Sequence, residues 1–133
     1  MAFTIILFGF STFNSYAINV GDKIGNVLNS DIKTYIDDYR IPSYTVDGKT
    51  VIVAEDLKNY GFDVTYSNSE RTLTIVRNET KKFTPIQNIQ NNTKKVGSVA
   101  FPYVYTDIKV KLGNRTIASF SINGSTVIFT ASP

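Results

Sequence analysis

Apolar and polar residues alternate along several short stretches of this chain, and each stretch predicts a β-strand. Ile32, Thr34 and Ile36 alternate with polar positions, and Phe62 and Val64 begin a similar run. A period of two places one set of side chains on the core face of a sheet. The expected strands are 31–37, 41–46, 50–53, 62–66 and 72–76.

Turn residues separate these strands. Asp47-Gly48 favours the type I′ turn of a two-residue hairpin, and Asp37-Asp38 can also take positive φ. Pro42 interrupts the stretch 41–46, which predicts a bulge or an edge position there. Three strands therefore precede residue 54 as two consecutive hairpins.

A short helix is predicted over 54–61. Glu55 and Asp56 are acids of its first turn, and Gly61 is its expected stop. Leu57 and Tyr60 follow Val53 at helical spacing, so one face can pack on a sheet. The order β-β-β-α-β-β predicts an α+β fold, in which a five-stranded antiparallel sheet packs on one short helix.

Residues 31–52 recur at 107–128 without a gap. At an offset of 76, nine of the 22 aligned pairs are identical, whereas unrelated segments would share about one or two. The expected organisation is a module at 18–76, a polar linker at 77–95 and a truncated second repeat, β only, at 96–133. The second repeat stops before its helix. The first-copy members of the identical pairs are residues 31, 32, 33, 41, 43, 48, 50, 51 and 52.

The second copy presents an apolar face that no helix of its own covers. That face must pack on the first copy, pair with another chain or remain poorly ordered, so self-association through 96–133 is expected. Its residues are Ile108, Val110, Leu112, Phe120, Ile122 and Val127.

The first 17 residues predict a signal peptide. An apolar run from Phe3 to Phe10 precedes the small-x-small pattern Ser15-Tyr16-Ala17, although no Lys or Arg stands before the run. The alternative is an uncleaved apolar N-terminal segment. Cleavage would leave a secreted or cell-surface protein with no stable membrane span.

Composition narrows the chemistry further. The chain has no Cys and no His, which disfavours zinc, copper and nucleophile–histidine sites. No cofactor or metal is expected. The net charge of +3 divides into −3 over 18–76 (six basic, nine acidic) and +6 over 77–133 (eight basic, two acidic). This asymmetry indicates a solvated surface or an attraction to anionic wall polymers or between the halves. Nucleic acid is not an expected partner.

Three stretches of the chain form a recognisable set: Ile41-Pro42-Ser43-Tyr44, Asp47-Gly48-Lys49-Thr50 and the residues from Val53 to Val64. Together they resemble the copper amine oxidase-like N-terminal domain family, also called the stalk domain family. The resemblance covers about 19–76 in full and 96–130 in part. It implies an α+β stalk module of exported bacterial proteins, often in tandem and often beside wall-binding or hydrolytic domains. It does not imply oxidase activity and provides no catalytic residues.

Three groups of residues could carry chemistry. Adjacent Glu55 and Asp56 point in different directions on a helix and are better explained as helix-start acids than as an acid/base pair. Asp31, Asp37, Asp38 and Asp47 are better explained as turn formers than as Ca²⁺ ligands, since the second copy replaces the last three with Gly113, Asn114 and Asn123.

Lys33, Tyr35 and Arg40 form a candidate ligand-binding face, against the alternative of a plain solvated strand. The main hypothesis is a non-enzymatic exported stalk, spacer or interaction module at the bacterial cell surface. A carbohydrate- or cell-wall-binding module and a non-catalytic fragment of a larger secreted hydrolase are the alternatives. The expected partners are a wall polymer or another protein.

Overall fold

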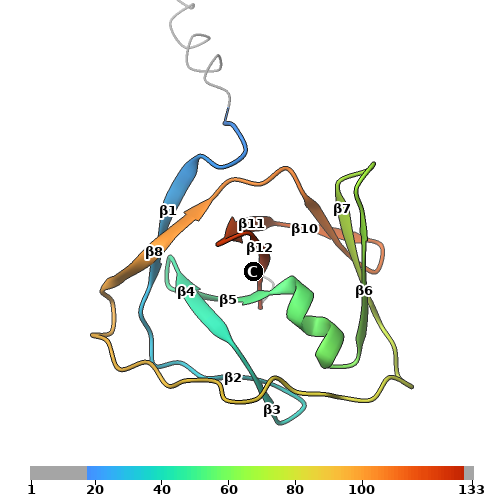
Figure 1. The fold of residues 1–133 in the computed structure, drawn as a ribbon, viewed down its shortest axis with the longest axis horizontal. Helices are drawn as coiled ribbons and strands as arrows, with labels where there is room; N and C mark the ends of the chain where they lie inside the picture. The colour runs from blue at the N-terminus through green and yellow to red at the C-terminus, as the bar shows by residue number, and fades with distance from the viewer. Residues whose placement is uncertain (1–17, 131–133) are drawn as a thin grey trace, which may run out of the picture.

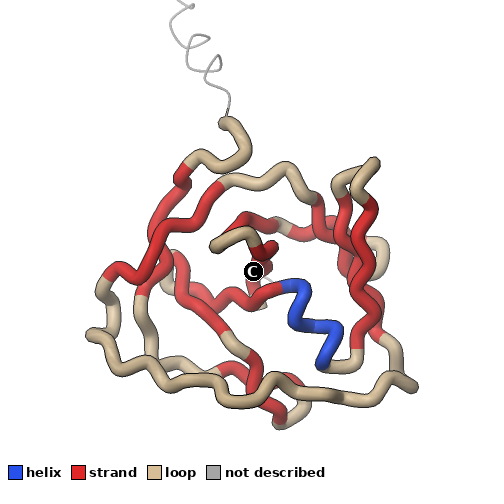
Figure 2. The backbone as a smooth tube through the Cα atoms, viewed as in Figure 1, coloured by secondary structure: helices blue, strands red, loops and turns tan. Residues whose placement is uncertain are grey.

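The structure, a computed structural model, describes residues 18–130, which form mainly short β-strands with one short helix (Figures 1 and 2). The predicted signal peptide lies outside the described residues. The elements are β1 (Lys23–Leu28), β2 (Thr34–Ile36), β3 (Tyr39–Ile41), β4 (Ser43–Val46), β5 (Lys49–Val53), the 3₁₀ helix η2 (Ala54–Asn59), β6 (Phe62–Ser67), β7 (Thr72–Arg77), β8 (Val99–Val104), β9 (Lys109–Leu112), β10 (Arg115–Ile117), β11 (Ser119–Ile122) and β12 (Ser125–Phe129).

Both copies of the repeat contribute to one closed six-stranded barrel. Its strand order is β1-β4-β5-β12-β11-β8, so three strands come from each copy. The Asp47-Gly48 turn is as predicted, with φ of 51° and 73°, and its counterpart in the second copy, Asn123-Gly124, has φ of 50° and 84°. These values fit a type I′ turn, and each turn joins two neighbouring barrel strands.

The two copies are related by a pseudo-two-fold axis. Ile52 pairs with Ile128, which is its own counterpart at the offset of 76. Asn26 pairs with Pro102 in the same way where β1 meets β8. For each remaining pair between these strands, adding 76 to the first-copy residue and subtracting 76 from its partner gives another observed pair. The sequence repeat is therefore also a symmetry of the barrel.

A second sheet again joins the copies. Its order is β10-β9-β7-β6, with the β6–β7 hairpin from the first copy and the β9–β10 hairpin from the second. β7 and β9 run parallel, with Leu73 opposite Val110. The counterpart of β9 in the first copy, β2, pairs only with β3 among the described strands.

The predicted α+β fold, a five-stranded antiparallel sheet packed on one short helix, is wrong. The structure is mostly β and contains several sheets. The expected second strand breaks at Pro42: β3 pairs with β2, while β4 pairs with β1 and β5 in the barrel. Ala118 marks the same break in the second copy, so the break belongs to the repeat and not to proline alone. The helix is a six-residue 3₁₀ helix.

The core consists of two clusters of buried side chains. One fills the barrel and the other lies beneath η2. The barrel cluster contains Val27, Val46, Val51, Tyr103, Phe120, Ile122 and Val127. The η2 cluster contains Ile41, Ile52, Ala54, Leu57, Tyr60, Leu73, Ile75, Val110 and Ile128.

Most of the apolar face of the second copy is therefore covered by the first copy. Val110, Phe120 and Val127 are buried, whereas Leu112 is 39% exposed. In the first copy Ile32, expected to face the core, is 54% exposed because it precedes β2 in a loop. Self-association through 96–133 stays a prediction.

The segment between β7 and β8 contains no strand or helix but is attached to the core. Phe83 and Ile86 pack on the η2 cluster. The Tyr60 hydroxyl donates to the Arg40 carbonyl and accepts from the Ile86 amide at 3.1 Å. Tyr60 thus joins η2, β3 and this segment at one buried point.

Candidate functional site

A groove of about 720 Å³ opens between three segments of the chain. Its walls come from 27–33 at the end of β1 and the following loop, from 40–44 at the junction of β3 and β4, and from 86–92, with Ala100 and Phe101 of β8 at one side. Many of its lining side chains are amides. They are Asn29, Gln87, Asn88, Gln90, Asn91 and Asn92.

Side-chain hydrogen bonds hold the segment 86–92 in place. The Arg40 guanidinium donates to Asn91 Oδ1 at 2.9 Å. Asn92 Nδ2 donates to Asn29 Oδ1 at 3.1 Å and to the Ser30 carbonyl at 3.2 Å. Each amide side chain carries both donors and acceptors, so such a wall suits a ligand rich in hydroxyl or amide groups.

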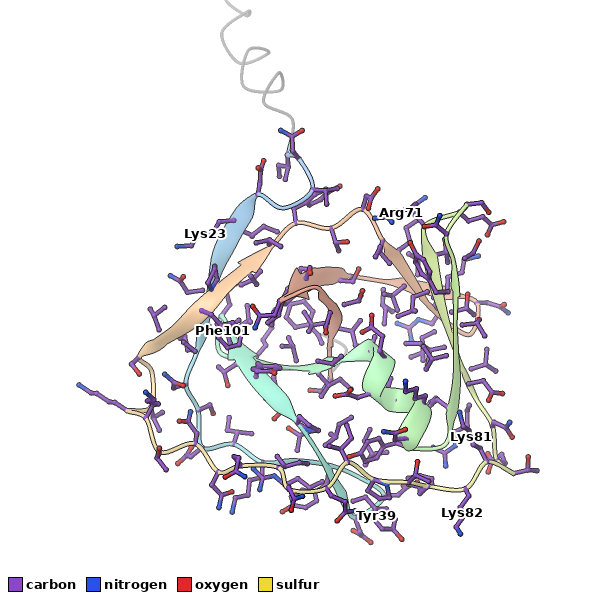
Figure 3. The ribbon with its side chains drawn as sticks, in the orientation of Figure 1. Lys23, Tyr39, Arg71, Lys81, Lys82 and Phe101 are labelled. Atoms are coloured by element: carbon purple, nitrogen blue, oxygen red, sulfur yellow. The ribbon has the colours of Figure 1, made fainter. Side chains whose placement is uncertain are left out.

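Two aromatic side chains also line the groove. Tyr44 of β4 and Phe101 of β8 meet edge to face, with ring centroids 5.6 Å apart and planes at 79°. Figure 3 labels Phe101, which belongs to β8; in the barrel β1 lies between β8 and β4. An aromatic pair next to amides combines an apolar surface with polar recognition groups.

The structure brings together two of the three predicted ligand-face residues. Lys33 and Arg40 line the groove. Tyr35 does not line it: this side chain is 55% exposed and lies directly across from Arg40 in the β2–β3 hairpin. Tyr35 therefore flanks the groove on the face from which Arg40 projects.

Sequence reasoning missed the amide wall. Asn and Gln occupy five of the six positions from 87 to 92. Such a composition is typical of a polar linker, and nothing in the local sequence indicates that the segment folds back across β3. The high content of Asn and Gln is nonetheless the sequence feature that could have identified the groove.

The adjacent acids Glu55 and Asp56 have separate surroundings. Both Glu55 carboxylate oxygens accept from the Thr126 amide, at 3.1 and 3.3 Å, so this side chain links η2 to β12 of the second copy. Burial raises the pKa of Asp56, the Glu55 charge raises it further, and Lys58 opposes both. Glu55 thus has a structural contact that an acid/base pair would not require.

Three of the four aspartates considered as Ca²⁺ ligands occupy turns, whereas Asp31 lies in the loop before β2 and lines the groove. Asp37, Asp38 and Asp47 all have positive φ. Asp47 also accepts from the Tyr103 hydroxyl at 3.4 Å, and the pKa of Tyr103 is raised by burial and then by this carboxylate. Within residues 18–130 no group of three or more Asp, Glu, His or Cys side chains is arranged to hold a metal ion.

Other charged side chains connect the two copies. Arg71 lies at the turn of the β6–β7 hairpin (Figure 3). Its Nη2 lies 2.6 Å from Asp107 Oδ1 of the second copy. The pKa of Asp107 is lowered, chiefly by this hydrogen bond. Across residues 18–130 no helix is long and apolar enough to cross a membrane.

No family model, curated protein or solved structure matches this chain. The resemblance to the stalk domain family therefore stays a prediction.

Proposed function

We propose that this chain is a non-enzymatic interaction module of an exported bacterial protein and acts as a stalk-type spacer at the cell surface. The observation that carries the proposal is the structural use of its acids. Glu55 links η2 to β12, Asp47 forms a turn, and Asp107 pairs with Arg71 across the two copies. Of these three acids, two link the copies and one shapes a hairpin turn, so each has a structural role in place of acid/base chemistry.

Cell fractionation tests the export part of this proposal. The chain, carrying a C-terminal epitope tag, is produced in a bacterial host and followed in cytoplasmic, wall and medium fractions. We expect it in the wall or medium, with a mature N-terminus after Ala17. A Leu7→Arg variant, which interrupts the apolar run, should remain in the cytoplasm. Recovery of the unsubstituted chain in the cytoplasm with Met1 retained would overturn the proposal.

A second candidate function is binding of a cell-wall carbohydrate or other wall polymer. The amide-lined groove favours it, because neutral donors and acceptors stand there beside Lys33, Arg40 and the Tyr44–Phe101 pair. Hydroxyl-rich polymers need such paired donors and acceptors. An anionic polymer would meet two cations and the carboxylate of Asp31, which also lines the groove, so the neutral groups carry this argument more than the charge does.

Sedimentation with purified cell wall separates the two functions. If the groove binds, the chain sediments with the wall, and Lys33→Ala and Tyr35→Ala reduce the bound fraction. Tyr66→Ala is the matched control, because Tyr66 is also an exposed strand tyrosine but lies in the β6–β7 hairpin, which contributes no residue to the groove, whereas Tyr35 lies opposite the lining residue Arg40. Absence of sedimentation would remove the wall-binding function and leave the spacer.

A further inference from the structure

The helix η2 occupies a groove of defined chemistry in the first copy. Its leading acid, Glu55, accepts from the Thr126 amide. Leu57 packs in the same buried cluster as Ile41, with Ile36 at its border. Tyr60, directly after the helix, donates its hydroxyl hydrogen to the carbonyl of β3 at Arg40. An acid, an aliphatic side chain and a tyrosine thus dock at three points.

The pseudo-two-fold axis maps these docking points onto the second copy. At the offset of 76, Thr126 corresponds to Thr50, and Ile41 corresponds to Ile117. The same operation takes Arg40 to Thr116 and Ile36 to Leu112. All four mapped residues line a second groove, of about 760 Å³. This groove is the counterpart of the one that η2 fills, and no helix occupies it among residues 18–130.

The charge of the second groove suits an acidic occupant. Lys49 and Arg115 line it, and none of its lining residues is Asp or Glu. Lys49 corresponds to Ser125 of the second copy and is adjacent to Thr50, whose amide corresponds to the one that binds Glu55. A carboxylate at the Thr50 amide would therefore have a lysine as its neighbour, where Glu55 has a serine. The Lys49 ammonium lies 5.5 Å from the centroid of the Phe129 ring, which forms part of the apolar lining.

We infer that this groove binds a short helical segment of a partner protein that carries the η2 pattern. The pattern is a first-turn carboxylate, an aliphatic residue two positions later and a tyrosine five positions later, as in Glu55, Leu57 and Tyr60. The carboxylate binds at Thr50 and Lys49, and the apolar side chain covers exposed Leu112. This interaction is independent of the amide-lined groove, so wall binding and segment binding can fail separately.

Titration of the ¹⁵N-labelled full chain with an N-acetylated synthetic peptide of residues 55–61 tests the inference, since positions 53 and 54 map onto Phe129 and Thr130 of the protein itself. We expect amide shifts centred on Thr50, Thr116 and Ile117. Replacing the peptide glutamate at position 55 with glutamine should weaken binding about tenfold, because the hydrogen bond from the Thr50 amide then goes to a neutral acceptor and the attraction to Lys49 is lost.

Variants of the protein locate the contact. Arg115→Glu should weaken peptide binding by a similar factor. Lys111→Glu should leave it unchanged, since Lys111 is an exposed cation on the neighbouring strand that does not line the groove. Both variants should keep the dispersed spectrum of the folded chain.

Three outcomes would overturn the inference. The first is an absence of shifts at millimolar peptide. The second is a set of shifts centred on Thr126 and Arg40, which would mean that the peptide displaces η2 from its own groove. The third is equal binding of the glutamate and glutamine peptides, which would leave the mapped carboxylate contact without effect.

Discussion

Removing the hydroxyl of Tyr60 should lower the stability of the whole molecule. Tyr60 is fully buried, and its hydroxyl serves two backbone groups: it donates to the Arg40 carbonyl and accepts from the Ile86 amide. Tyr60→Phe keeps the ring and leaves both partners unsatisfied in a partly buried place. A buried polar group that loses its partner costs about 1–3 kcal/mol. Taking the low end for each partner, we expect a loss of about 2 kcal/mol.

Urea denaturation followed by circular dichroism measures this loss. We expect the midpoint to fall while the dependence on urea stays constant, because the same surface is exposed on unfolding. Tyr35→Phe is the control, since Tyr35 is 55% exposed, and its stability should stay within about 0.5 kcal/mol of the unsubstituted chain.

The amide of Ile86 provides a local readout. Its hydrogen exchange should accelerate in Tyr60→Phe beyond what the global loss of stability explains, because the variant removes the acceptor of that amide. A Tyr60→Phe variant as stable as the Tyr35→Phe control would refute the argument that this hydroxyl fastens the segment after β7 to the core.

Three further predictions concern single positions. Gly61→Ala should destabilise by about 1–2 kcal/mol, because Gly61 has φ of 87° and an added Cβ would lie 2.8 Å from the Phe83 ring; Gly21→Ala, with φ of 95° and open space, should cost less in the same urea assay. Thr45→Val should raise the melting temperature and stabilise by about 1 kcal/mol, because the buried Thr45 hydroxyl has no hydrogen-bond partner among the described residues; a lower melting temperature would contradict this. Asp56→Asn should stabilise the folded chain at pH 7, because a raised pKa in the folded state means that ionisation of Asp56 disfavours folding. This gain in stability should disappear as the pH falls below the ordinary aspartate pKa, where the carboxyl group is protonated in both states. A gain that persists there would contradict ionisation of Asp56 as its cause.

Local geometry could be predicted from the sequence where neighbouring residues decide it. Asp47-Gly48 and Asn123-Gly124 form the expected turns, because both residues of each pair tolerate positive φ. Gly61, the expected helix stop, has φ of 87° directly after η2 and Tyr60. Tyr35, which the sequence places on the candidate ligand-binding face, is exposed.

The strand partners could not be predicted in the same way. Alternation indicates which face of a strand is buried but not which strand lies beside it. The parallel pairing of Leu73 with Val110 joins segments that the repeat had assigned to separate units. For the candidate site, Lys33 and Arg40 were identified, whereas Asn91 becomes a lining residue only because the chain returns across β3.

The pairing of Ile52 with Ile128 has a consequence for how the chain acquires its structure. β5 has β4 on one side and β12 on the other, so the barrel cannot close before the ribosome has synthesised β12. Pairings between strands this distant along the chain form late and slowly, because the entropy of closing the intervening loop is lost before the stabilising contacts are made. In a nascent chain the barrel would therefore stay open until β12 has been synthesised. The export that we propose would need the polypeptide in such an open state, with the core forming only after passage through the export channel.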